Sequence, residues 1–178
     1  RCKLGHGVAS LQKSAEGYEV ETVDSQRFLA KSVVVAAPPQ HAAPILSGID
    51  SLISEKLSQI PLAPIAVVHL GFRDRAQAVP EGFGCLIPRE ENIRTLGILF
   101  PSRLFEGRAP EGGDLLAGFV GGMLDRDAIE LDDESLTQIV LGDLKTLTGH
   151  ETAPDFVRVK RYTHAIPQFV AGHLDRMA

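Results

Sequence analysis

The side chains best suited to chemistry are few in this 178-residue chain, and their spacing matches no metal or nucleophile motif. The six histidines form no HxxxH or HExxH pair, the spacing that places two zinc-binding imidazoles on one helix face. Cys2 and Cys85 lack the CxxC spacing of a metal or redox site, so we predict free thiols. A GxSxG nucleophile elbow is also absent from the sequence. Neither metal catalysis nor a serine hydrolase is therefore indicated.

Three apolar segments that contain glycine are more informative. They are Gly82–Pro88, Leu96–Phe100 and Leu115–Gly122. Residue type alone predicts that each is a strand packing a core. Glycine is unfavourable within a strand unless the strand bends or something approaches its backbone closely. A flat, mostly apolar ligand lying across the sheet would use such an approach, with aliphatic and aromatic side chains lining its pocket.

Two further motifs follow these segments. The loop Ser102–Gly112 reads SRLFEGRAPEG, and its Arg108 is interpreted either as a cation for a carboxylate or as a residue that fixes the loop by binding carbonyls. Near the C-terminus, His164 and His173 flank an IPQF segment, and neither receives a catalytic role. His69 lies within an apolar strand and is predicted to be a core histidine.

Together these motifs resemble the substrate-binding part of protoporphyrinogen oxidases, flavin-dependent enzymes of haem and chlorophyll synthesis in the flavin amine oxidase superfamily. The loop SRLFEGRAPEG and the segment YTHAIPQFVAGHLDR carry the likeness together with the three strands. The resemblance implies that Leu86 and Leu99 bracket one tetrapyrrole ring, with Phe119 opposite. It also implies that the backbone of Phe83 and Gly84 lies beside the substrate.

The N-terminal part is similar to the segment of flavin amine oxidases that returns to the FAD domain. The resemblance implies that the backbone of Val8 meets the adenine and that Ala37 and Pro38 lie near the cofactor. No strand followed by GxGxxG and a helix, the pyrophosphate-binding unit of such enzymes, is present. The chain begins without an initiator Met, and we expect it to be a piece of a longer protein that binds FAD.

The implied reaction is the oxidation of protoporphyrinogen IX to protoporphyrin IX, with flavin as hydride acceptor and molecular oxygen as the final oxidant. Three alternatives stay open. A sister enzyme of the same scaffold oxidises coproporphyrinogen III, and a basic pocket rim formed by Arg89, Arg94, Arg103 or Arg108 would favour it. The others are a different flavin amine oxidase and a non-enzymatic porphyrin-binding module.

Composition and charge limit the partners. The net charge is −5 and the Lys and Arg residues are scattered, so nucleic acid is not an expected partner. The longest apolar run, at residues 62–72, is shorter than the about 20 residues of a membrane span. Cytoplasm or the cytoplasmic face of a membrane is the expected location. Members of the resembled family associate with membranes peripherally and form dimers, and this sequence decides neither point.

Periodicity predicts an α+β fold, a mixed β-sheet with flanking helices. The expected strands and helices follow, by residue number: strands at 8–11, 18–23, 32–37, 62–72, 83–88, 96–100, 115–121 and 156–162, and helices at 50–60 and 132–149, with helix starts at Pro39 and Pro167. The run 32–37 is β-branched and typical of a strand buried on both faces. We expect residues 1–38 to belong to the FAD domain, 39–165 to the substrate-binding domain, and 166–178 to begin a returning helix.

Overall fold

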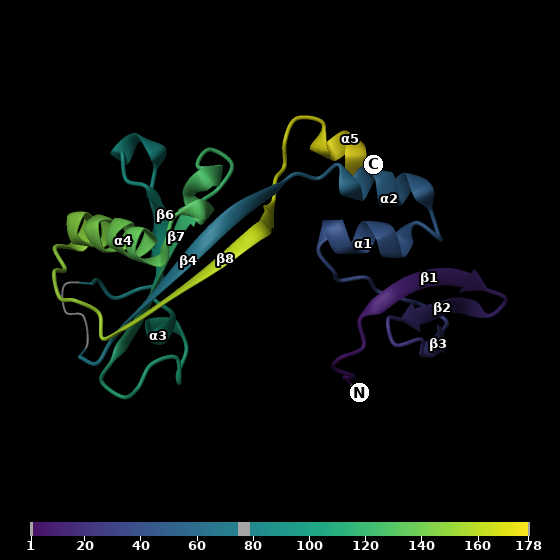
Figure 1. Ribbon diagram of the computed structural model, residues 1–178, viewed down its shortest axis with the longest axis horizontal. Helices are drawn as coiled ribbons and strands as arrows, with labels where there is room; N and C mark the ends of the chain where they lie inside the picture. The colour runs from purple at the N-terminus through teal and green to yellow at the C-terminus, as the bar shows by residue number, and fades with distance from the viewer. Residues whose placement is uncertain (1, 75–78, 178) are drawn as a thin grey trace. The chain divides into compact units, whose positions relative to one another are not determined.

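A computed structural model describes residues 2–74 and 79–177, and the chain folds as two compact units. Unit 1 comprises Arg1–Pro61 with Pro167–Ala178, and unit 2 comprises Leu62–Ile166. The expected division after residue 38 differs from this partition, because helix α1 (Pro39–Leu46) packs against strand β1 (Val8–Ser14) and helix α2 (Ser51–Ser58) packs against α1. Each unit is drawn in Figure 1 and is described below by itself.

Unit 1 contains a three-stranded antiparallel sheet in the order β1-β2-β3. Strands β1 and β2 (Gly17–Thr22) confirm the strands predicted at 8–11 and 18–23, whereas β3 (Arg27–Ala30) was not predicted. The core of this unit is small, with Leu11, Ala42 and Ala43 buried. Asp50 caps helix α2: its carboxylate accepts hydrogen bonds from the Leu52 and Ile53 N–H groups, which a helix start leaves without intrahelical partners.

Two predictions for unit 1 are wrong. Residues 32–37 form no strand, and Val34 is 91% exposed, because no strand among the described residues pairs with this segment. Pro167 does not open a helix. It ends strand β8 (Phe156–Pro167), where a missing N–H is tolerated at a strand terminus, and the last helix α5 (His173–Met177) begins six residues later.

Unit 2 is built on a five-stranded sheet in the order β5-β6-β7-β4-β8. Its strands are β4 (Leu62–Phe72), β5 (Gly84–Leu86), β6 (Thr95–Leu99), β7 (Asp114–Gly121) and β8. The pairings β5-β6, β6-β7 and β7-β4 are antiparallel. Backbone bonds from Asp155 N–H to the Gly71 carbonyl and from Gln168 N–H to the Pro61 carbonyl show that β8 also runs antiparallel to β4. The α+β fold with flanking helices is confirmed.

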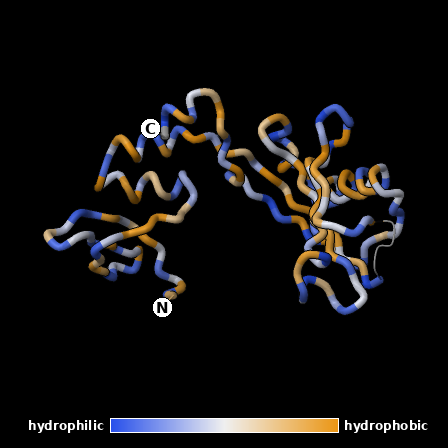
Figure 2. The backbone as a smooth tube through the Cα atoms, turned by 180° about the vertical axis from the view of Figure 1, so that it is seen from behind, coloured by the Kyte–Doolittle hydropathy of each residue, from blue (hydrophilic) through white to orange (hydrophobic). Residues whose placement is uncertain are grey.

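One face of this sheet carries helix α4 (Asp133–Thr148) and the main core (Figure 1). The side chains of Val68, Leu70, Leu116 and Val120 alternate toward this face, and all are fully buried with Leu136 and Val140 of the helix. Hydrophobic residues follow the strands of this unit, as Figure 2 shows. The Asp143 carboxylate of α4 accepts hydrogen bonds from the Thr95 N–H and hydroxyl, which ties the helix to β6.

Helix α4 has the ends that its sequence predicts. Asp132 caps the first turn by accepting from the Ser135 N–H, and this bond holds the pKa of Asp132 below its ordinary value. Gly149 ends the helix in the left-handed conformation. Short helices η1 (Arg89–Glu91), α3 (Pro101–Leu104) and η2 (Arg126–Glu130) lie in the connections and were not predicted. No helix among the described residues is long and apolar enough to cross a membrane.

Candidate functional site

The face of the unit 2 sheet opposite α4, called here the open face, collects four of the five predicted substrate-binding residues. Directly paired residues of antiparallel strands point to the same face of a sheet. One row across β5, β6, β7 and β4 contains Gly84, Leu99, Ala117 and His69, and the adjacent row contains Leu86, Gly97, Phe119 and Val67. The register therefore brings Gly84, Leu86, Leu99 and Phe119 together from three separate strands.

The open face is apolar and graded in exposure. Ile65, Val67 and Ala117 are buried there, with Phe119 and Ala165 packed beside them. Leu99 and Phe119 are half-buried, whereas Leu86 on the edge strand is 88% exposed. A surface of this composition can receive a flat apolar molecule.

Phe83, the fifth predicted residue, lies just before β5. Its carbonyl accepts a hydrogen bond from the Phe100 N–H at 3.1 Å, so its backbone is held at the end of β6. The Phe83 side chain is 67% exposed. The structure thus places the backbone of Phe83 next to the open face, but its side chain is not part of the two rows.

The strand glycines have a different explanation from the one that the sequence suggested. Gly84 has a φ of +142°, and a Cβ there would lie 2.3 Å from the Ile98 carbonyl oxygen. A Cβ on Gly118 would lie 2.4 Å from Val140 of α4. Protein packing therefore demands glycine at both positions. Their presence alone is no sign of a ligand, and the site rests on the rows of side chains.

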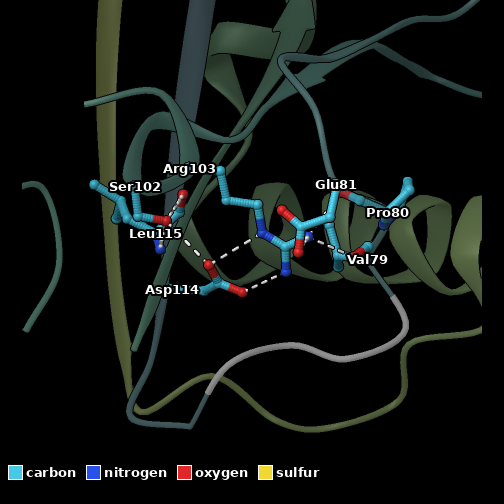
Figure 3. A network of polar contacts seen from close by, with 7 residues as sticks. All are labelled: Val79, Pro80, Glu81, Ser102, Arg103, Asp114 and Leu115. Carbon is cyan, nitrogen blue, oxygen red and sulfur yellow. Dashed lines mark hydrogen bonds and ion pairs between the residues drawn. The ribbon is translucent and has the colours of Figure 1, made fainter. Parts of the chain in front are cut away.

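A buried ion pair anchors the segment that leads into the open face (Figure 3). The Arg103 side chain is 4% exposed and binds the Asp114 carboxylate, which is 2% exposed, at 2.7 Å. Its other nitrogen donates to the carbonyls of Val79 and Pro80, two residues upstream of Gly82. The Ser102 hydroxyl also donates to Asp114 and accepts from the Leu115 N–H. Arg103 thus joins the loop after β6, the start of β7 and the approach to β5.

This placement decides which arginines could form a basic rim. The hydrogen bond that Arg103 donates to the Asp114 carboxylate raises the pKa of Arg103, and the guanidinium donors are directed into the protein. Arg94 is paired with Asp125 at 2.7 Å, and that bond raises the Arg94 pKa. The Arg108 guanidinium lies 5.8 Å from the ring centre of Phe105, a cation–π distance. Arg103 and Arg94 are therefore engaged with protein carboxylates.

Arg108 also lines a cavity of about 420 Å³ at the far end of β4 and β7. The cavity wall includes Gly71, Leu115 and Phe156, and the Phe156 side chain covers the position where Gly71 lacks a Cβ. The alternative reading of Arg108, that it fixes its loop through carbonyls, receives no support from its contacts among the described residues.

The predicted cofactor residues lie in unit 1. Val8 and Ala37 line an apolar cavity of about 400 Å³, together with Leu11, Val20 and His41. Pro38 does not line it; it precedes the first turn of α1. The Gln40 side-chain oxygen in that turn is buried without a hydrogen-bond partner among the described residues. The apolar walls of this cavity fit one side of a flat heteroaromatic cofactor.

The histidines form no metal site. Among residues 2–74 and 79–177, no group of three or more His, Cys, Asp or Glu side chains could hold a metal ion. His173 packs on Phe169 with ring centres 4.5 Å apart, and His164 bonds Thr163. Neither contact gives these two histidines a catalytic role.

Residues 1–176 match the family model of flavin containing amine oxidoreductases. The chain belongs to this family. Among curated amine oxidoreductase relatives, it is 31% identical over 191 residues to the chloroplastic protoporphyrinogen oxidase of Nicotiana tabacum, covering 100% of this chain and 35% of that protein. It is also 30% identical over 174 residues to coproporphyrinogen III oxidase of Bacillus subtilis (strain 168), covering 97% and 37%. The chain thus spans about a third of the length of these relatives.

Solved structures of low identity show the same fold. Reduced UDP-galactopyranose mutase has a TM-score of 0.75 at 10% identity, covering 99% of this chain and 38% of that protein. Cyclohexylamine oxidase from Brevibacterium oxydans has a TM-score of 0.68 at 15% identity, covering 97% and 40%. Membership of the amine oxidoreductase family implies a flavin cofactor.

Sequence reasoning missed two features of the site. His69 was interpreted as a core histidine, yet its register with Ala117 places it on the open face. The sequence could have indicated this, because Ile65, Val67 and His69 are at alternate positions of β4 and therefore share one face of the sheet. The Arg103–Asp114 pair had no such signal, since the partners are eleven positions apart in the sequence and only the fold brings them together.

Proposed function

We propose that this chain is the substrate-binding portion of a FAD-dependent enzyme that oxidises protoporphyrinogen IX to protoporphyrin IX with molecular oxygen. The observation that carries the proposal is the alignment of Gly84, Leu86, Leu99 and Phe119 in two adjacent rows of one uncovered sheet face. These residues were selected by resemblance to porphyrinogen oxidases. If they were ordinary strand residues, they would lie on opposite faces of the sheet as often as on one face. The sequence likeness to curated porphyrinogen oxidases supports the same substrate class.

In this proposal the open face binds one side of the macrocycle. Leu86 and Leu99 contact one pyrrole ring, and Phe119, which lies in the same row as Leu86, contacts the neighbouring ring surface. Neighbouring strands are about 4.8 Å apart, so the three strands offer a width comparable to a tetrapyrrole. The protein's contribution is orientation and exclusion of water rather than an acid or base.

The flavin would be held in unit 1 with the Val8 backbone and the segment of Ala37 and Pro38 beside it. When bound, it supplies the hydride-accepting ring. We expect FAD binding in the full-length protein rather than in this chain alone. The reason is that the pyrophosphate-binding glycine motif is absent from this sequence. Location in the cytoplasm or on the cytoplasmic face of a membrane, peripheral membrane association and homodimerisation stay predictions.

Coproporphyrinogen III is the second candidate substrate. It carries more carboxylates than protoporphyrinogen, and two exposed cations of β8, Arg158 and Lys160, lie on the correct side of the sheet, because Val157 and Val159 face α4. Val159 packs into the α4 core and Arg161 binds the Ile129 carbonyl on that side, so alternation places Lys160 on the open face. Lys160 lies 5.8 Å from the Tyr162 ring and has no ion-pair partner among the described residues. A non-enzymatic porphyrin-binding module is the third reading.

Parallel oxidation assays test these readings. The full-length protein, loaded with FAD, is given protoporphyrinogen IX and coproporphyrinogen III separately, and porphyrin fluorescence is followed. Leu86→Arg and Phe119→Arg place a charge on the open face, and Leu147→Arg, on the last turn of α4, is the matched control.

Faster turnover of protoporphyrinogen that is lost in both open-face variants and kept in the control supports the proposal. A preference for coproporphyrinogen that falls in Lys160→Met moves the assignment to the second candidate. Binding of porphyrin without oxidation, with FAD demonstrably bound, leaves the binding module.

A further inference from the structure

His69 is the one polar side chain in the two rows of the open face. It pairs with Ala117 on β7, and Ala117 pairs with Leu99 on β6. Strand spacing therefore places His69 about 10 Å from Leu99 across the sheet. Its neighbours along β4 on this face are Val67 and Gly71, and neither has a polar side chain. On the β7 side the imidazole thus adjoins apolar residues that were assigned to the substrate, whereas on the other side of β4 the neighbouring strand β8 carries the cations Arg158 and Lys160.

The His69 ring is incompletely satisfied. Its Nδ1 atom is buried and has no hydrogen-bond partner among the described residues. Buried polar atoms in proteins are nearly always paired, and each exception requires an explanation. The His69 residue as a whole is only half-buried, so part of it is accessible on the open face.

His150 provides an internal comparison. It is 7% exposed, and its Nε2 also has no partner among the described residues. However, the His150 ring meets the edge of Phe72 at 4.9 Å, and Phe72 belongs to the core beneath α4. His150 therefore packs within the closed side of unit 2, whereas His69 faces the side that receives the proposed substrate.

We propose that His69 is the polar anchor of the substrate site, with its imidazole accepting a hydrogen bond from a pyrrole N–H of the porphyrinogen. This inference rests on the proposed function. A neutral imidazole has one acceptor nitrogen, and a porphyrinogen carries four pyrrole N–H donors at the centre of an otherwise apolar disc. A macrocycle lying flat on Leu99, Ala117 and Phe119 would lose water from those donors. One acceptor placed within the apolar surface offsets that loss and fixes the orientation of the macrocycle.

Substitutions at His69 separate this role from simple packing. His69→Leu introduces an apolar side chain of similar size and removes both nitrogens. His69→Asn keeps a polar group near the position of Nδ1, and His69→Gln keeps one near Nε2. His150→Gln is the matched control, because it replaces the other partly unsatisfied histidine of unit 2 on the opposite side of the sheet. All variants are made in the full-length protein and assayed with FAD and protoporphyrinogen IX, with rates normalised to bound flavin.

The expected result is a loss of about 10-fold in kcat/KM for His69→Leu, which corresponds to one hydrogen bond. The flavin absorbance spectrum and the FAD content stay unchanged, since unit 1 is not altered. Either His69→Asn or His69→Gln recovers to within about threefold, and His150→Gln stays within about twofold of the parent. Recovery by one amide and not the other identifies the nitrogen that makes the contact.

Two results would overturn the inference, and they are distinguishable. If the parent enzyme oxidises protoporphyrinogen and His69→Leu keeps kcat/KM within twofold, the anchor role is wrong and the proposed function stands. If the FAD-loaded parent neither oxidises nor binds the macrocycle, measured by quenching of protoporphyrin IX fluorescence, the proposed function and the anchor role both fail.

Discussion

The two faces of the five-stranded sheet are made by alternate residues of the same strands, yet they differ in almost every physical respect. Beneath α4, Leu70, Leu116 and Val120 are wholly buried in a closed core. On the open face, one residue away along each strand, Phe119 is half-buried and His69 interrupts the apolar surface. Adjacent positions of one strand thus serve stability and, in the proposed function, recognition separately.

This separation has a practical meaning for substitutions. A change on the α4 face alters the free energy of unfolding first, because it removes packed contacts or opens a cavity. A change on the open face alters ligand affinity first, because the side chain already borders solvent. Substitutions on the two faces should therefore have different signatures.

Breaking the Arg103–Asp114 pair should give the largest loss of stability. Arg103→Met leaves the buried Asp114 carboxylate without its main cation, and removal of one partner of a buried pair costs about 3–5 kcal/mol. The segment before β5 also loses its attachment at Val79 and Pro80, so substrate affinity should fall with stability. Urea unfolding followed by circular dichroism measures the first effect, and the KM for porphyrinogen measures the second.

A double variant supplies the control. Arg103→Met with Asp114→Leu replaces both charges by apolar groups and should recover part of the unfolding free energy. It should not recover KM, because the Val79 and Pro80 carbonyls still lack their donor. Recovery of KM together with stability would show that Arg103 does not position the open face.

On the α4 face, Leu116→Ala should lower the free energy of unfolding by about 3 kcal/mol, within the range for a buried leucine that leaves a cavity. The KM of the folded enzyme should change by less than about twofold, since Leu116 points away from the open face. A large KM change at unaltered stability would contradict the division of labour between the faces.

On the open face, Leu86→Ala should have the opposite signature. Leu86 is 88% exposed, so its truncation should cost less than about 0.5 kcal/mol of stability. The kcat/KM for porphyrinogen should nevertheless fall by about 3- to 10-fold, as expected when one apolar contact of a ligand is removed. Equal activity of Leu86→Ala and the parent would remove Leu86 from the site.

The smallest expected effect is on the pH dependence of stability, through Asp132 at the N-terminal cap of α4. The hydrogen bond from the Ser135 N–H lowers the pKa of Asp132 in the folded protein below its ordinary value of 3.8. Its contribution to stability is therefore complete above that value and is lost as the pH falls through the lower folded pKa. Asp132→Asn should flatten this part of the stability profile, measured as thermal midpoints between neutral and acid pH. An unchanged acid dependence would show that Asp132 does not contribute to it.

The sequence predicted the elements of unit 2 closely and those of unit 1 less well. Strand β4 has the bounds that were expected, because an apolar run is delimited by Pro61 and by the charged residues after Phe72. Strand β3 was missed, since four residues without a clear alternation carry little signal. Residues 32–37 show the opposite error: their strong β propensity predicted a strand, but no described strand pairs with them and they form none.

For the candidate site, the sequence predicted which residues to consider better than it predicted where their side chains lie. Resemblance selected Leu86, Leu99 and Phe119, but their common face depends on the register among β5, β6 and β7. Register is a tertiary property, because a slip by one residue moves every side chain to the other face. For the same reason His69 could not be distinguished from a core histidine until β4 was paired with β7.

Strand β8 forms one edge of the sheet and runs for twelve residues, long enough to recruit a strand from another molecule. Its exposed cations Arg158 and Lys160 oppose such recruitment, because two copies meeting edge to edge would bring like charges together. Lys160, considered above as a partner for substrate carboxylates, thus also opposes aggregation through the edge of β8. Replacing both cations with valine should leave the fold intact and turn β8 into a nucleation point for aggregation.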